Sequence, residues 1–139
     1  MFEQIKVRSE EETPIEEFLQ TAGFFVQPVT EGVLRAGRSG ELPVFLSTTE
    51  TSLYFEVDLG NISEFADAEL YFKILDLNTE IVPVSLGINS TNSNDPRLVL
   101  AESREIRGLD ENELLSVFDA LELAAQRIEV LLSPYVGHA

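Results

Sequence analysis

The sequence contains no cysteine, no tryptophan and a single histidine, His138, next to its last residue. Without thiols the chain cannot form disulfides, thiolate zinc sites or iron–sulfur clusters, and it has no cysteine nucleophile. Because the one imidazole lies in a terminal tail, serine nucleophiles would have no general base nearby. We therefore predict no catalytic residue, no cofactor-binding residue and no metal ligand, and we expect a protein that is not an enzyme.

Basic side chains are also scarce. Nine Lys and Arg oppose 25 Asp and Glu, which gives a formal net charge of −16. A surface this acidic repels nucleic acids and anionic membranes, so we expect neither as a partner. Long apolar runs are missing too, whereas a membrane-spanning helix needs about 20 consecutive apolar residues. The first residues lack the apolar run of a signal peptide, so we expect a cytoplasmic protein without direct membrane insertion.

The apolar content is nevertheless high, at 44% of 139 residues. This content is typical of a chain that folds around its own core, and not of a disordered acidic tail. The sequence predicts a single domain over residues 1–139. Within it we expect residues 1–12 to be a flexible acidic N-terminal segment and residues 135–139 to be a frayed tail. No role is assigned to the acidic run Glu10–Glu12.

Two helices are predicted in the first half of the chain. Thr13 is followed by Pro14 and Glu16, the arrangement of an N-cap, a first helical residue and a capping box. A second helix is predicted near residues 65–75, with Asn61 or Ser63 as its N-cap. Its apolar residues form a broad stripe: Phe65, Ala66, Ala68, Leu70, Phe72, Ile74 and Leu75. We expect this second helix to be well buried because its stripe is so broad.

The last helix has the clearest N-terminal pattern. Asp110 is placed as the N-cap, Glu113 follows three residues later, and Leu109 can pack on Leu114. Apolar residues then recur at helical spacing for about six turns, until Ser133–Pro134 is predicted to end the helix.

Six strands are predicted from short runs rich in β-branched and aromatic residues, at 24–26, 33–34, 44–46, 53–59, 81–88 and 97–102. The first four predict an antiparallel meander, and the last two predict a hairpin around a polar loop. The fold class is therefore α+β, an antiparallel sheet with helices on one face and the order α-βββ-α-ββ-α.

Two loops have patterns that could bind a ligand. Asn89–Asp95 places amide and carboxylate oxygens at alternate positions, but lacks the glycine and the distal glutamate of a calcium loop. Gly37–Gly40 resembles part of an anion-cradling turn beside Arg35 and Arg38, without the Lys-Ser/Thr of a phosphate loop. A plain hairpin turn is the favoured interpretation of the second loop, and the sequence leaves binding at either loop open.

The last helix also carries more apolar residues than one buried stripe needs. Leu123 and Val130 fall outside the main stripe, which is itself more typical of a core face than of a partner groove. Surplus apolar surface is the one hint of an interface. The candidate partner-binding residues are Leu114, Phe118, Leu121, Leu123 and Val130.

Two families share short segments with this sequence. Residues 97–106 (RLVLAESREI) and 108–114 (GLDENEL) resemble the last strand, the turn and the start of the C-terminal helix of class I type III secretion chaperones. Residues 42–47 (LPVFLS) and 82–85 (VPVS) resemble two Pro-containing strands of a bacterial YjfI-like family of unknown function. The resemblance implies a secretion-chaperone-like fold, a homodimer and a role in binding another protein, and it brings no catalytic residue.

Three functions follow as hypotheses. The first is a non-enzymatic chaperone or adaptor-like homodimer that holds a protein client on an apolar strip. The second rests on the gene neighbours of the YjfI-like family and is an acidic adaptor or regulator of a basic coiled-coil membrane-remodelling protein of the phage-shock-protein-A type. The third is a metal- or ligand-binding sensor that uses the Asn89–Asp95 loop.

Overall fold

The computed structural model describes residues 2–8 and 13–136, so Glu10–Glu12 and His138 lie outside the described residues. In chain order the elements are η1 (Phe2–Gln4), β1 (Lys6–Val7), β2 (Thr13–Pro14), α1 (Ile15–Thr21), β3 (Phe25–Thr30), β4 (Val33–Gly37), β5 (Val44–Thr48), β6 (Ser52–Gly60), α2 (Ala68–Leu77), β7 (Ser85–Asn89), β8 (Arg97–Glu105) and α3 (Glu111–Val136).

Six strands form one antiparallel sheet in the order β3-β4-β5-β6-β8-β7, and β1 pairs with β2 in a separate two-stranded ribbon. The meander β3 to β6 and the hairpin β7–β8 both match the prediction. The predicted strand at 81–88 begins later than expected, because residues 81–84 form a turn with a cis peptide bond before Pro83. The α+β class and the element order are confirmed.

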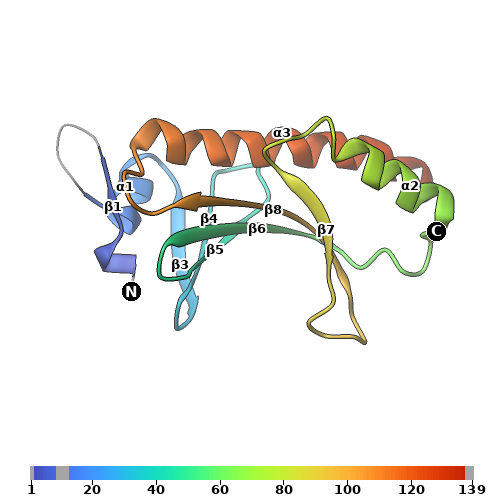
Figure 1. Cartoon of the computed structure of the whole chain (residues 1–139), viewed down its shortest axis with the longest axis horizontal. Helices are drawn as coiled ribbons and strands as arrows, with labels where there is room; N and C mark the ends of the chain where they lie inside the picture. The colour runs from blue at the N-terminus through green and yellow to red at the C-terminus, as the bar shows by residue number, and fades with distance from the viewer. Residues whose placement is uncertain (1, 9–12, 137–139) are drawn as a thin grey trace.

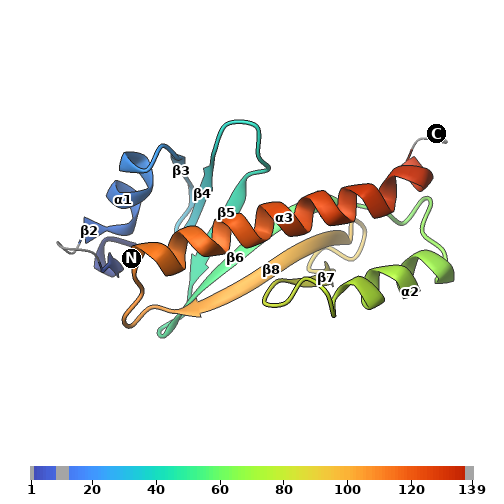
Figure 2. The same cartoon turned by 90° about the horizontal axis from the view of Figure 1, so that it is seen from above.

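The helices gather on one face of the sheet (Figure 1). Seen from above, α3 runs diagonally across the strands, α2 lies alongside its C-terminal half, and α1 lies near its N-terminal end (Figure 2). No helix of residues 2–8 and 13–136 covers the opposite face of the sheet, and the β7–β8 loop points away from the helices (Figure 1). This arrangement leaves the outer surface of the helical layer open, whereas at the β7 edge of the sheet the Asn78 side chain accepts from the Leu86 N–H and donates to the Leu86 carbonyl.

The core lies between α3 and the central strands. On β6 the alternate residues Leu53, Phe55 and Val57 are buried, as the period of two predicts. Phe118 of α3 packs against Phe24 and Phe55, with ring centroids 4.6 and 5.9 Å apart. The buried residues of α3 repeat at helical spacing: Leu114, Val117, Phe118, Leu121, Ala124, Ala125 and Ile128.

Local hydrogen bonds explain where α3 begins and why it passes its proline. Asp110 Oδ1 accepts a hydrogen bond from the Glu113 N–H at 2.7 Å, so the predicted N-cap is confirmed. The predicted stop at Ser133–Pro134 is wrong, because α3 continues to Val136. Pro134 cannot donate to the carbonyl of Val130, but the Ser133 hydroxyl donates to that carbonyl at 3.2 Å. Tyr135 and Val136 are thus helical and do not belong to a frayed tail.

The starts of the other two helices differ from the predictions. No side-chain cap precedes α1, because Thr13 is paired with Val7 in the small ribbon. In the loop before α2, Asn61 accepts from the Ser63 N–H and closes a local turn. The N-cap of α2 is Asp67, whose carboxylate accepts from the Leu70 N–H at 2.8 Å.

The beginning of the chain is part of the core. Phe2, Ile5 and Val7 are buried among the core residues, and the Arg8 N–H donates to the carbonyl of Leu109. The prediction of a flexible segment over residues 1–12 is therefore wrong for residues 2–8. Burial of three apolar side chains outweighs the acidic composition of the stretch that follows them.

Candidate protein-binding surfaces

The predicted partner-binding residues of α3 separate into two groups. Leu114, Phe118 and Leu121 are buried against the sheet, so they cannot contact a partner in this fold. Leu123 is 63% exposed and Val130 is 74% exposed. These two lie seven residues apart, about two turns, and therefore point in the same outward direction. We call them the α3 ridge.

A groove lies on one side of the ridge, between α3 and the turn that joins α2 to β7. Its volume is about 590 Å³. It is lined by Glu80, Ile81, Val82, Pro83, Ala120, Leu123, Ala124, Gln126, Arg127 and Val130. Its one carboxylate and its one guanidinium form an ion pair, since Arg127 Nη2 lies 3.3 Å from Glu80 Oε2. We call this the neutral groove, because its charges balance and the rest of its lining is mostly apolar.

A second groove lies on the other side of α3, next to the β4–β5 loop and the end of β6. Its volume is about 630 Å³. It is lined by Gly40, Glu41, Leu42, Asp58, Leu59, Glu122, Ala125, Gln126, Ile128, Glu129, Leu132, Ser133 and Val136. Four of these described residues are carboxylates and none is basic. We call this the acidic groove.

The outer side of α2 forms a third apolar surface, which corrects the expectation of a well-buried helix. Leu70, Ile74 and Leu77 are buried, but Phe72 is 71% exposed and Leu75 is 67% exposed. Tyr71 is also exposed, and its position on the helix turns it to the same side. Lys73, on the opposite side, lies over the Tyr135 ring of α3. Tyr71, Phe72 and Leu75, the α2 stripe, therefore face away from α3.

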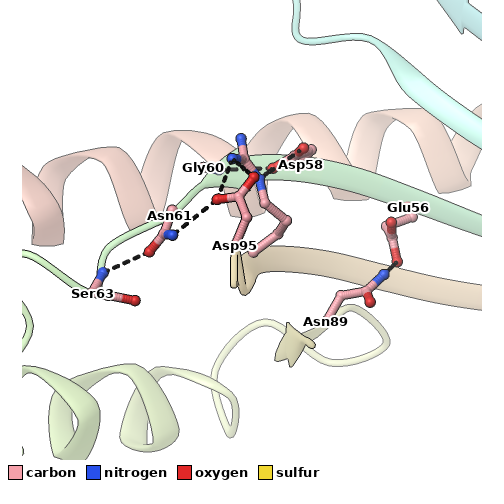
Figure 3. A network of polar contacts seen from close by, with 8 residues as sticks. Glu56, Asp58, Gly60, Asn61, Ser63, Asn89 and Asp95 are labelled. Atoms are coloured by element: carbon pink, nitrogen blue, oxygen red, sulfur yellow. Dashed lines mark hydrogen bonds and ion pairs between the residues drawn. The ribbon is translucent and has the colours of Figure 1, made fainter. Parts of the chain in front are cut away.

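A polar network ties the β7–β8 hairpin to the end of β6 (Figure 3). The Arg97 guanidinium donates to both carboxylate oxygens of Asp58 and of Asp95, at 3.1 to 3.2 Å. Asn61 donates to Asp95 at 2.9 Å, and this bond, together with Arg97, lowers the pKa of the Asp95 carboxyl. The same contacts to Asp58 and Asp95 raise the pKa of Arg97. The network therefore joins the β7–β8 hairpin to Asp58, which lines the acidic groove.

The Asn-rich loop uses its oxygens for its own turns. The side chains of Asn89 and Asn92 accept from the N–H groups of Thr91 and Asn94, and Asn89 Nδ2 donates to Glu56 (Figure 3). Within residues 2–8 and 13–136, no cluster of three or more His, Cys, Asp or Glu side chains is placed to hold a metal ion. The described part of the loop therefore belongs to no such cluster, and two of its amide oxygens are already bonded within the loop.

The Gly37–Gly40 segment is a structural turn between β4 and β5. Its cation, Arg38, forms ion pairs with Glu41 and Asp119 and lies 5.0 Å over the Phe24 ring. Gly40 has a φ of +82°, which favours glycine. Since acidic neighbours already satisfy the guanidinium, an anion would have to displace them.

Taken together, an α+β domain with apolar grooves on its helical layer defines a class of protein that binds other polypeptides. The chain belongs to the Tir chaperone protein (CesT) family, which matches residues 13–128. This confirms the resemblance to type III secretion chaperones and supports the protein-binding chaperone hypothesis. Neither the coiled-coil adaptor nor the sensor gains support. The likeness to the YjfI-like family stays a prediction.

Solved structures share the fold at low sequence identity. A chain of the heterodimeric ExoU–SpcU complex from the type III secretion system of Pseudomonas aeruginosa is 22% identical, with a TM-score of 0.69 over 86% of this chain and 98% of that one. YbjN from E. coli is 11% identical, with a TM-score of 0.55 over 80% and 85% of the two chains. A search of curated protein sequences gave no significant match.

Sequence reasoning missed the acidic groove and the α2 stripe. One signal for the stripe was present, because seven of the ten residues of α2 are apolar or aromatic, which exceeds what one face of the helix can bury. The acidic groove had no such signal, since Leu42, Asp58 and Glu129 come from three separate elements. None of the helices in the described part of the chain has the length and hydropathy that a membrane span requires.

Proposed function

We propose that this protein is a non-enzymatic cytoplasmic chaperone that binds a segment of one client polypeptide and works by binding alone. The observation that carries the proposal is the α3 ridge, two large apolar side chains that a monomer leaves in water beside two grooves. Membership of a chaperone family supports it. The similar ExoU–SpcU structure is a complex between two different proteins, which fits a protein partner for this chain.

The physical basis of client binding is desolvation. Each Å² of apolar surface removed from water contributes about 25 cal/mol, and the ridge and the groove linings supply such surface on the chaperone. Association costs several kcal/mol in lost freedom, so a short segment must fill a groove rather than touch one side chain. The net charge of −16 then keeps the complex soluble while apolar groups are engaged.

We also propose that the chaperone is a homodimer, with the α2 stripe as its contact surface. Phe72 and Leu75 are large, strongly exposed and side by side on a helix whose opposite side contacts α3. A two-fold axis would set the same stripe of each copy against the other. The α3 ridge would stay free for the client.

The test is affinity purification of the full chain from the cells that make it, with quantification of the bound polypeptides. We expect one polypeptide at a fixed ratio to the chaperone. The double variant Leu123→Ser, Val130→Ser should lose it while keeping the far-UV circular dichroism of the fold, because both side chains are exposed.

Val29→Ser is the matched control, since Val29 is an exposed apolar residue on β3, remote in sequence from the ridge. This variant should retain the polypeptide. The proposal fails when no polypeptide is recovered at a fixed ratio, and also when the ridge variant holds it as well as the unmodified chain does.

A further inference from the structure

The acidic groove differs from the neutral groove in whether its carboxylates are paired with a basic side chain. Glu41 is paired with Arg38, and Asp58 with Arg97. Glu122 accepts only an amide hydrogen bond from Gln126, at 3.1 Å, and Glu129 has no ion pair within residues 2–8 and 13–136. Among the residues that the structure describes, these two carboxylates on one side of α3 therefore have no cation as a partner.

The two uncompensated carboxylates stand above an apolar floor. Ile128 and Ala125 are buried at the base of the groove, while Leu42 and Val136 are exposed at its rim. A ligand with apolar groups would gain by covering this surface. A ligand without positive charge would remove two carboxylates from water without pairing them, which costs free energy.

The dimensions of the groove suit an extended chain. From Glu122 to Val136 the helix rises about 21 Å, which is the length of about six extended residues. Successive turns at Ile128, Leu132 and Val136 are about 6 Å apart, close to the spacing of alternate side chains on a strand. Glu122 and Glu129 are about 10 Å apart along the helix, between the lengths of two and of four extended residues, which are the spacings at which side chains share one side of a strand.

We propose that the acidic groove binds an extended, positively charged segment of the client, with apolar side chains at alternate positions and a Lys or Arg at two of the positions between them. The inference rests on the proposed chaperone function and names the chemistry of its client. The apolar side chains contact the floor, and the cations pair with Glu122 and Glu129. The neutral groove, whose Glu80 and Arg127 already pair, makes no such selection.

The test uses a fluorescently labelled synthetic peptide of about eight residues with this pattern, titrated with the full chain and followed by anisotropy. We expect saturable binding that weakens about tenfold between about 50 and about 500 mM salt. A peptide with Glu in place of both cations should not bind, and one with Ser in place of the apolar residues should bind at least about fivefold more weakly.

The decisive variant is Glu122→Gln, Glu129→Gln, which keeps the size of both side chains and removes two charges. We expect it to bind the cationic peptide at least about fivefold more weakly. Glu31→Gln, Glu64→Gln removes the same charge from exposed positions outside the groove and should bind as the unmodified chain does. Equal weakening by both variants would show attraction by net charge alone and overturn the inference.

Failure of this inference and failure of the chaperone function give different results. The copurified polypeptide could bind the Glu122→Gln, Glu129→Gln variant as tightly as it binds the unmodified chain. That result would leave the proposed chaperone function intact and would overturn the proposal that the acidic groove selects a cationic segment. When the designed peptide does not bind at all, the inference is equally overturned. Loss of the copurified polypeptide in the groove variant, with retention in the Glu31→Gln, Glu64→Gln control, supports it.

Discussion

The inward and outward sides of the helical layer are made of the same kinds of residue but behave differently. On α3, Leu121 is buried and Leu123 is exposed, although only two positions separate them. On α2, Leu70 and Ile74 are buried, whereas Phe72 and Leu75 lie in water. Position around the helix, and not residue type, therefore decides which apolar side chains stabilise the monomer. The outward ones are available for a partner.

The largest effect on stability is expected from a substitution on the inward side of the helical layer. Phe118→Ala removes the ring that packs on Phe24 and Phe55 and leaves a cavity between α3 and the sheet. We expect the free energy of unfolding to fall by about 3–5 kcal/mol. Urea denaturation followed by circular dichroism measures this value. A loss below about 1 kcal/mol would show that Phe118 lies outside the packed core.

A feature of the fold could be predicted from the sequence where it depends only on residues that are neighbours along the chain. The start of α3 was predictable because Asp110, Glu113 and Leu109 are neighbours whose interactions need no other element. The alternation on β6 was predictable for the same reason. The start of α2 was not, because Asn61 closes its own turn with Ser63 and leaves the cap to Asp67.

The candidate site was less predictable than the fold. Leu123 and Val130 were identified as surplus to the α3 stripe, and their exposure agrees with that interpretation. Leu114, Phe118 and Leu121 lie on the main stripe, and their burial agrees with the core face that the stripe pattern favours and not with their place among the candidate partner-binding residues. The acidic groove depends on the β4–β5 loop reaching α3, a tertiary contact that Arg38 and Asp119 help to make.

A smaller effect on folding, but a clear effect on assembly, is expected on the outward side of α2. Leu75→Glu places a carboxylate in the α2 stripe, where a two-fold axis would bring two copies of that charge together. We expect the dimer dissociation constant to rise at least about tenfold while the monomer stays folded. Sedimentation velocity over a range of concentrations measures the constant.

Val29→Glu is the control for Leu75→Glu, because it adds the same charge to an exposed apolar position on β3. It should leave the dimer intact. Dissociation by both variants would point to net charge instead of the α2 stripe. An unmodified chain that is monomeric at every concentration would remove the dimer from the proposed function and leave client binding to the α3 ridge.

The smallest effect is expected at the one polar residue among the buried side chains of the described chain, Glu102. It lies on β8 opposite Phe55, on the side of the sheet that α3 covers, and one of its oxygens has no hydrogen-bond partner. Burial raises the pKa of its carboxyl above the ordinary value of 4.5, although Arg104 acts in the opposite direction. The charged carboxylate therefore destabilises the folded state. This destabilisation reaches its full value only when the pH is above the raised pKa.

Glu102→Gln should accordingly raise the unfolding free energy at neutral pH by about 1 kcal/mol, because it keeps an acceptor for Arg104 and removes the buried charge. The sign follows from the raised pKa. Well below pH 4.5 the carboxyl is protonated in both states and the variant has no advantage, and the advantage grows as the pH rises through the raised pKa. Thermal unfolding of both proteins over this pH range measures the difference, with Glu105→Gln on the same strand as the control for loss of one exposed charge. A variant that is less stable at neutral pH would show that the ion pair with Arg104 outweighs burial, and that the inward side of the helical layer tolerates a charge as well as an apolar side chain.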